Sequence, residues 1–105
     1  MSLKKIQDDT NQWTSQFTPQ YWPPHEMLAR LTEETGELAR EINHLYGTKK
    51  KKDSESENSI GKELVDIIFT VVCIANSQRI DLSQEWDEMV DKKLYCRDKD
   101  RYQKE

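Results

Sequence analysis

Apolar side chains recur along most of the chain in steps of three and four residues, the spacing that places them on one face of an α-helix. A first helix is predicted near the N-terminus, with Ser2 as its cap. Its apolar face consists of Leu3, Ile6, Thr10, Trp13 and Phe17. The prolines of "TPQYWPP", residues 18–24, then end the pattern because proline cannot continue a helix.

The next repeat predicts a helix of about five turns that begins at Pro24 and ends before Gly47. Proline suits the first position of a helix, and glycine commonly follows the last one. The apolar face of this second helix consists of Leu28, Leu31, Thr35, Leu38, Ile42 and Leu45.

Two further helices are predicted after the polar segment that ends at Asn58. Ser59 can cap the third, which runs through "GKELVDIIFTVVCIAN" to about Arg79, and Asp81 with Gln84 resembles a capping box that starts the fourth. The apolar face of the fourth consists of Trp86, Met89, Val90 and Leu94. Because no alternating strand pattern occurs, the chain is predicted to be all-α, with four helices in one domain over residues 1–105.

The composition suggests that one chain cannot cover its own third helix. That helix is apolar on nearly every side, yet only 34% of the residues are hydrophobic and another 34% are charged. We therefore expect a homodimer to complete the bundle. Residues 48–58 are polar and low in complexity, which predicts a mobile loop.

Charge and cysteine content exclude several classes of function. The net charge of −4 argues against a general binder of nucleic acid polymers. The N-terminus lacks the apolar core of a signal peptide, and no apolar run reaches membrane-spanning length. Cys73 and Cys96 have neither metal-ligand spacing nor the density of a disulfide scaffold, so the expected location is the cytoplasm.

Two carboxylates, Glu63 and Asp66, stand near the start of the apolar third helix and share one stripe of it. For Glu63 alone, a favourable place in the first helical turn is sufficient explanation. Asp66 is followed at once by three large apolar residues, so burial without a cation would be costly. This arrangement favours a functional carboxylate at position 66.

The second helix carries a matching acidic arc, Glu33, Glu34 and Glu37, beside its apolar face. An ordinary solvated face is an equal alternative for this arc taken alone. Two acidic i,i+3 pairs on antiparallel helices could, however, present four oxygen ligands to one hard cation, with Mg²⁺ the natural candidate. Because Mg²⁺ usually completes its coordination with waters and phosphates, the pattern indicates nucleotide chemistry.

With these segments the chain resembles the all-α nucleoside triphosphate pyrophosphohydrolases of the MazG type. Their mark is a Glu-Glu-x-x-Glu segment, here "EETGE" from Glu33 to Glu37, followed after a variable loop by Glu-x-x-Asp, here "ELVD" from Glu63 to Asp66. The resemblance extends from about Tyr21 to Tyr102. It implies a MazG-like four-helix bundle, assembled as a homodimer or a dimer of dimers, that hydrolyses a ribo- or deoxynucleoside triphosphate to the monophosphate and pyrophosphate for housekeeping of the nucleotide pool.

The resemblance also implies roles for particular residues. The metal ligands for Mg²⁺, with Mn²⁺ as a substitute, would be Glu34, Glu37, Glu63 and Asp66, and Glu33 would be a further ligand or a base that orients water. The implied phosphate clamps are Lys93, Arg97 and Arg101, for which a charged helix end is an equal alternative. Of the aromatic residues before the acidic helix, Trp22 and His25 are the predicted base-stacking pair, whereas Trp13 and Phe17 are expected in the core.

Two rival interpretations remain at this point. A di-iron bundle needs two Glu-x-x-His pairs, and this chain has one, Glu41 with His44. A non-enzymatic helical oligomerisation module would place the acids on the surface, show no response to divalent metal and tolerate Asp66→Ala.

Overall fold

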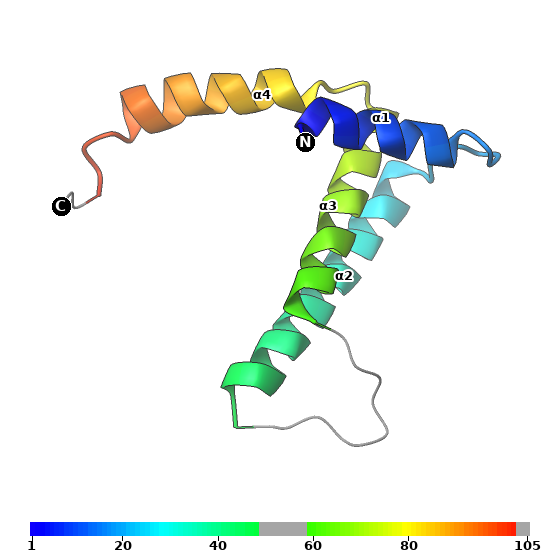
Figure 1. Ribbon diagram of the computed structural model, residues 1–105, viewed down its shortest axis with the longest axis horizontal. Coiled ribbons are helices and arrows are strands. Elements are labelled where there is room, and N and C mark those ends of the chain that lie inside the picture. Colours follow the sequence, from blue (N-terminus) through cyan, green and yellow to red (C-terminus); the bar gives the residue numbers. More distant parts are fainter. Residues whose placement is uncertain (49–58, 103–105) are drawn as a thin grey trace.

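The computed structural model describes residues 1–48 and 59–102, and within them every regular element is helical (Figure 1). Four α-helices follow one another: α1 (Leu3–Thr14), α2 (Pro24–Tyr46), α3 (Ile60–Ser77) and α4 (Leu82–Glu88). The last continues directly as a π-helical segment, η1 (Met89–Arg97). The predicted all-α class is confirmed. Apart from Thr48, the loop expected to be mobile lies outside the described residues.

The helix ends follow the predicted signals. Ser2 accepts a hydrogen bond from Lys5 N, and Ser59 accepts one from Lys62 N. Asp81 caps α4 by accepting from Ser83 N and Gln84 N. Such caps each stabilise a helix by about 1 kcal/mol. The first helix is shorter than its apolar repeat, because it ends at Thr14 and Phe17 falls in the turn that leads to Pro19.

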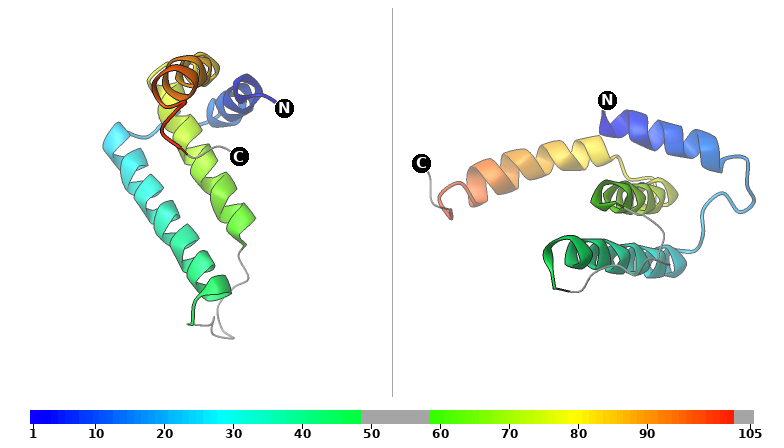
Figure 2. Two further views of the ribbon diagram at one scale, coloured as in Figure 1. Left: turned by 90° about the vertical axis from the view of Figure 1, so that its left-hand side faces the viewer. Right: turned by 60° about the horizontal axis from the view of Figure 1, so that its bottom comes forward.

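The helices α2 and α3 form an antiparallel hairpin, and α1 lies across one end of it (Figures 1 and 2). A polar network fixes that crossing. Gln7 donates to Asn76 Oδ1 and to the carbonyl of Ile80, and both bonds are 2.8 Å long. Asn76 in turn donates to the Tyr21 hydroxyl at 3.0 Å. The network therefore joins α1, the proline segment and the end of α3.

A C-terminal arm, defined here as residues 82–102, projects away from the hairpin (Figure 1). It contacts the rest of the molecule mainly through α1. The radius of gyration is 17.3 Å, whereas a compact domain of about 100 residues has about 13 Å. One chain is thus more extended than a compact domain of its length.

The hairpin leaves much of α3 uncovered, as its composition led us to expect. Among the residues that the structure describes, the buried apolar ones are Met27, Val72, Cys73 and Ala75. One side of α3 instead exposes Leu64, Val65, Ile68 and Val71, with Val65 exposed to 62%. Within the described part of the chain, no helix is both long enough and apolar enough to cross a membrane.

Candidate active site

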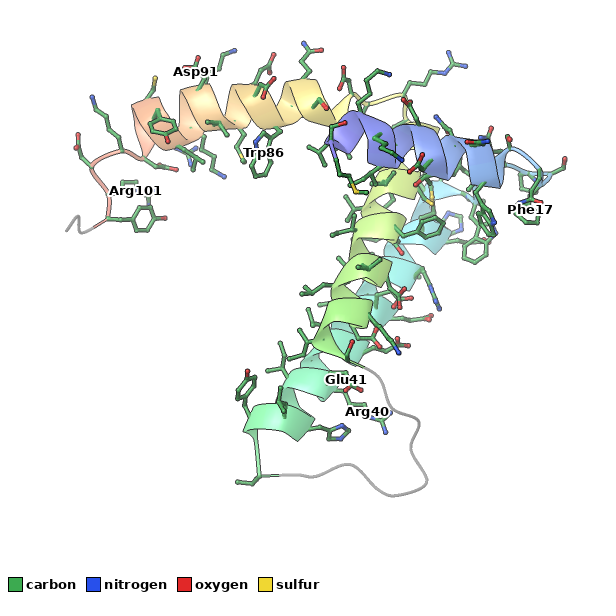
Figure 3. The ribbon with its side chains drawn as sticks, in the orientation of Figure 1. Phe17, Arg40, Glu41, Trp86, Asp91 and Arg101 are labelled. Carbon is green, nitrogen blue, oxygen red and sulfur yellow. The ribbon has the colours of Figure 1, made fainter. Side chains whose placement is uncertain are left out.

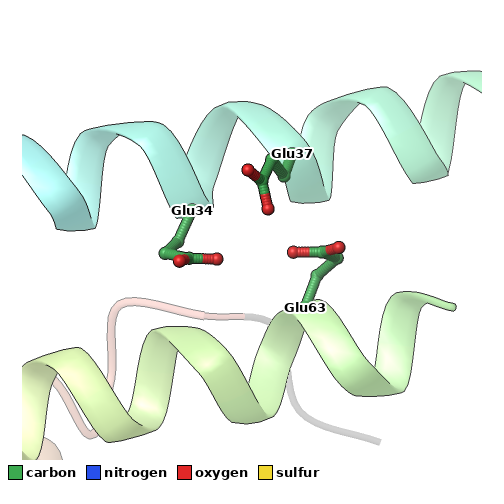
Figure 4. A group of neighbouring side chains, drawn as sticks. All are labelled: Glu34, Glu37 and Glu63. Carbon is green, nitrogen blue, oxygen red and sulfur yellow. The ribbon is translucent and has the colours of Figure 1, made fainter. Parts of the chain in front are cut away.

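Three carboxylates face one another across the hairpin, Glu34 and Glu37 from α2 and Glu63 from α3 (Figure 4). One oxygen from each lies within 4.8 Å of the others. The i,i+3 spacing on α2 places two acids on one side of the helix, and the first turn of α3 brings the third against them. These three residues form the acidic cluster. A di-iron centre would require histidine ligands as well, and none of the three is a histidine.

Two carboxylate oxygens of the cluster are buried without a hydrogen-bond partner. Glu34 is 1% exposed and Glu63 is 2% exposed, and the Oε2 atom of each lacks a hydrogen-bond partner. Burial raises the pKa of Glu63, and its hydrogen bond with Glu37 and the neighbouring negative charges raise it further. Burial likewise raises the pKa of Glu34, although the charge of Arg30 opposes that increase. Buried carboxylate oxygens without a partner, surrounded by like charges, are suitable ligands for a hard divalent cation.

Asp66 and Glu33 lie at the edges of the cluster. Asp66 stands one turn along α3 from Glu63 and raises the pKa of Glu34 and Glu63 through its charge, so it belongs to the same electrostatic group. Its carboxylate is outside the set of three that approach within 4.8 Å. The Glu33 side chain is 64% exposed and lies 3.5 Å from Arg30 Nη1.

Arg30 is a functional candidate that the sequence analysis missed. Its Nη2 atom lies 2.6 Å from Glu34 Oε1, one helical turn away on α2. The signal was present in the sequence, because a basic residue four positions before a buried acid can reach it on the same helix face.

A pocket of about 670 Å³ opens beside the cluster. Arg30, Glu34 and Asp66 line its charged end. Its aromatic wall consists of Trp13, Phe17, Tyr21, Trp22 and Phe69. Its size is within the usual range for small-molecule sites, and its mixture of aromatic wall and few charged groups is also typical of them.

The aromatic predictions were partly wrong. Trp13 and Phe17 were expected in the core, but both are about half exposed and line the pocket, with ring centroids 4.9 Å apart in an edge-to-face contact. The α1 crossing places them there, and helical periodicity does not reveal such a crossing. Trp22, one of the two residues predicted to stack on a base, lines the pocket, whereas His25, the other, is exposed and is not among the lining residues.

The basic residues of the arm do not meet the acidic cluster within this chain. Arg97 and Arg101 both bind Asp98, through bonds of 3.0 to 3.1 Å, and Lys93 is exposed on η1. Figure 3 shows Arg101 at the far end of the arm, away from Phe17 at the pocket. Arg101 also lies beyond the last helical residue, Arg97, so the three do not continue one i,i+4 row.

The helical hairpin therefore places a cluster of three carboxylates beside an aromatic pocket, and Glu34 belongs to both. The family model for the MazG nucleotide pyrophosphohydrolase domain matches residues 23–102. The chain therefore belongs to the MazG nucleotide pyrophosphohydrolase family, and it is a hydrolase that acts on phosphoanhydride bonds. This membership favours the enzyme over the non-enzymatic oligomerisation module.

Individual relatives agree with the family assignment. The uncharacterized protein YpjD of Bacillus subtilis (strain 168) is 46% identical over 101 residues, which span 96% of this chain and 90% of YpjD. The crystal structure of Bacillus subtilis YpjD superposes with a TM-score of 0.77 at 44% identity, covering 89% of this chain and 95% of that one. The crystal structure of the Bacillus-conserved MazG protein, a nucleotide pyrophosphohydrolase, gives a TM-score of 0.74 at 39% identity, with 89% of each chain covered.

Proposed function

We propose that this protein, as a single domain over residues 1–105, hydrolyses a ribo- or deoxynucleoside triphosphate to the monophosphate and pyrophosphate, with Mg²⁺ as cofactor and Mn²⁺ as a substitute. The observation that carries the proposal is the acidic cluster, which holds two unpartnered buried oxygens and whose Glu34 also lines the aromatic pocket. A triphosphate bound there would repel the carboxylates of the cluster, and a divalent cation between them would remove that repulsion.

The ligands that would hold the cation are Glu34, Glu37, Glu63 and Asp66. When bound, it neutralises phosphate charge and lowers the pKa of a coordinated water. The unpartnered Oε2 atoms of Glu34 and Glu63 are the best placed ligand atoms for the cation, because burial restricts their movement. The aromatic wall, including Trp22, would hold the nucleoside by stacking.

Hydrolysis of the α–β phosphoanhydride needs one water and one proton acceptor. The water oxygen forms a bond to the α-phosphorus, and the bridging bond to the β-phosphate breaks, which releases pyrophosphate. A carboxylate of the cluster accepts the proton of the water. Glu34, the member of the cluster that also lines the pocket, suits that role, while Glu33, at the outer edge of the cluster, would orient the water.

The assembly we propose is a homodimer or a dimer of dimers in the cytoplasm, in the service of nucleotide-pool housekeeping. The exposed apolar side of α3 and the extended outline of one chain support a second copy as cover. Because Lys93, Arg97 and Arg101 lie away from the cluster of their own chain, we propose that they bind phosphate at a site of another copy.

The test is pyrophosphate release from a panel of ribo- and deoxynucleoside triphosphates, with Mg²⁺ and with chelator. Metal-dependent release that Asp66→Ala lowers by about 100-fold or more is the expected result. Asp91→Ala is the matched control, since Asp91 is an exposed acid on the arm (Figure 3) and should leave the rate unchanged. If no nucleotide of the panel releases pyrophosphate, the proposed reaction is wrong.

A further inference from the structure

Arg30 stands at the boundary between the acidic cluster and the aromatic pocket. Its Nη2 atom contacts Glu34 Oε1 at 2.6 Å, and its side chain is 48% exposed on the pocket side. We propose that Arg30 exchanges partners during the reaction cycle: it holds Glu34 while the cluster carries no metal ion, and it binds a phosphate of the substrate once Glu34 is engaged as a ligand. This inference rests on the proposed function.

The first half of the proposal follows from competition for one carboxylate. Glu34 is almost completely buried, and its described ionic partner is Arg30 on one oxygen, while the other oxygen has none. Without Arg30, that carboxylate would face the like charges of Glu37 and Asp66 with no opposing charge beside it. A guanidinium and a divalent cation at the same carboxylate repel each other, so Arg30 opposes metal binding in the absence of substrate.

The second half follows from the position and shape of the side chain. Among the described residues that line the pocket, Arg30 is the one with a positive charge. A nucleoside on the aromatic wall and a metal ion in the cluster would leave the phosphates between them, beside Arg30. A guanidinium binds phosphate oxygens through two parallel hydrogen bonds, which a lysine ammonium cannot reproduce. The described cations of the arm offer no substitute within the chain, since none of them lines the pocket, and Arg97 and Arg101 are paired with Asp98.

The experiment separates the two halves by measuring two equilibria in solution. Calorimetric titration with Mn²⁺ alone gives the metal affinity. Titration with inorganic triphosphate at saturating Mg²⁺ gives the phosphate affinity without any contribution from a nucleobase. For Arg30→Gln we expect Mn²⁺ to bind about three- to tenfold more tightly. Triphosphate should bind about tenfold more weakly or worse, and Arg30→Lys should restore that affinity only in part.

The matched control is Lys4→Gln, which removes one positive charge from another i,i+4 ion pair. Lys4 lies 3.2 Å from Asp8 on the exposed side of α1 and does not line the pocket, so both affinities should stay as in the unsubstituted protein. Circular dichroism and thermal unfolding establish that each variant is folded.

Each other outcome has a distinct meaning. Weaker Mn²⁺ binding by folded Arg30→Gln would show that Arg30 supports Glu34 as a ligand, which overturns the exchange. Unchanged triphosphate affinity would overturn the phosphate contact. If neither the unsubstituted protein nor Arg30→Gln binds Mn²⁺, with or without triphosphate, the proposed function fails and this inference fails with it, whereas the two preceding results would leave the proposed function intact.

Discussion

Two sets of buried carboxylates in the described part of the chain, Asp98 on the arm and Glu34 with Glu63 in the hairpin, have opposite surroundings. On the arm, Asp98 is 6% exposed and receives a bidentate contact from Arg97, at 3.0 and 3.1 Å, and a third bond from Arg101. In the hairpin, Glu34 and Glu63 are buried more deeply, yet each keeps one oxygen without a partner. Hydrogen bonds from Arg97 lower the pKa of Asp98, while burial raises the pKa of both glutamates.

The difference distinguishes a structural carboxylate, whose charge is compensated within the chain, from a carboxylate that is available to bind a cation. Asp98 has its cations within the chain, so its negative charge is compensated where it stands. The acidic cluster has more negative charge than Arg30 can compensate, and a fold rarely keeps such an arrangement without a use for it. A cation supplied from solution is the use that this donor set fits.

The strongest test of this difference replaces a cluster carboxylate by its neutral amide. Glu63→Gln should lower the rate of pyrophosphate release by about 100-fold or more, because it removes a buried ligand oxygen. In chelator the variant should be at least as stable as the parent protein, since ionised Glu63 faces like charges there. Pyrophosphate assays and thermal unfolding in chelator measure the two effects.

Glu88→Gln provides the control for this change, since Glu88 is exposed on α4, and it should alter neither quantity. A folded Glu63→Gln protein that keeps its rate to within about tenfold would remove the cluster from the chemistry and would leave it a structural oddity.

The sequence predicted the parts that local chemistry decides. Ser59, Pro24 and Gly47 mark helix ends because capping and backbone geometry act over a few residues, and the structure confirms them. The juxtaposition of Glu34 with Glu63 was also within reach, because both acids occur on i,i+3 pairs of helices long enough to pack side by side.

Long-range geometry was beyond such reasoning. Trp13 looked like a core residue on its helical face, but it lines the pocket because α1 crosses the hairpin, and hydrogen bonds of Gln7 and Asn76 hold that crossing. Likewise, no repeat indicated that Asp98 would bind Arg97 and Arg101 where the helix ends. Pairings of this kind depend on where a helix stops, and pattern alone gives that boundary poorly.

A second test uses pH, because the pKa values of the two kinds of buried carboxylate are shifted in opposite directions from their ordinary values. The folded pKa values of Glu34 and Glu63 lie above 4.5, so their contribution to stability is complete below 4.5 and is lost as pH rises through the folded values. The folded pKa of Asp98 lies below 3.8, so its contribution is complete above 3.8 and is lost as pH falls through the folded value. In chelator, the free energy of unfolding should therefore decline on both sides of a maximum.

Urea unfolding at a series of pH values measures both declines. The double variant Glu34→Gln with Glu63→Gln should flatten the decline on the high-pH side and leave the low-pH side as it was. Asp98→Asn should have the reverse effect. A double variant with an unchanged high-pH side would mean that the cluster is not under electrostatic strain in the metal-free protein.

The smallest expected effect is local to the arm. Asp98→Asn keeps the size of the side chain but loses the ionic part of three hydrogen bonds, so the turn closed by Asp98 N and Lys93 O at 2.8 Å should open more often. Hydrogen exchange of amides 93–101 should become about three- to tenfold faster, while the amides of α2 and α3 and the affinity for Mn²⁺ stay unchanged. Asp91→Asn removes an equal charge from the exposed side of η1 and should leave exchange as it was. If Asp98→Asn instead weakened Mn²⁺ binding, the paired carboxylate of the arm and the unpaired ones of the hairpin would belong to one coupled site, and their contrast would no longer separate structure from function.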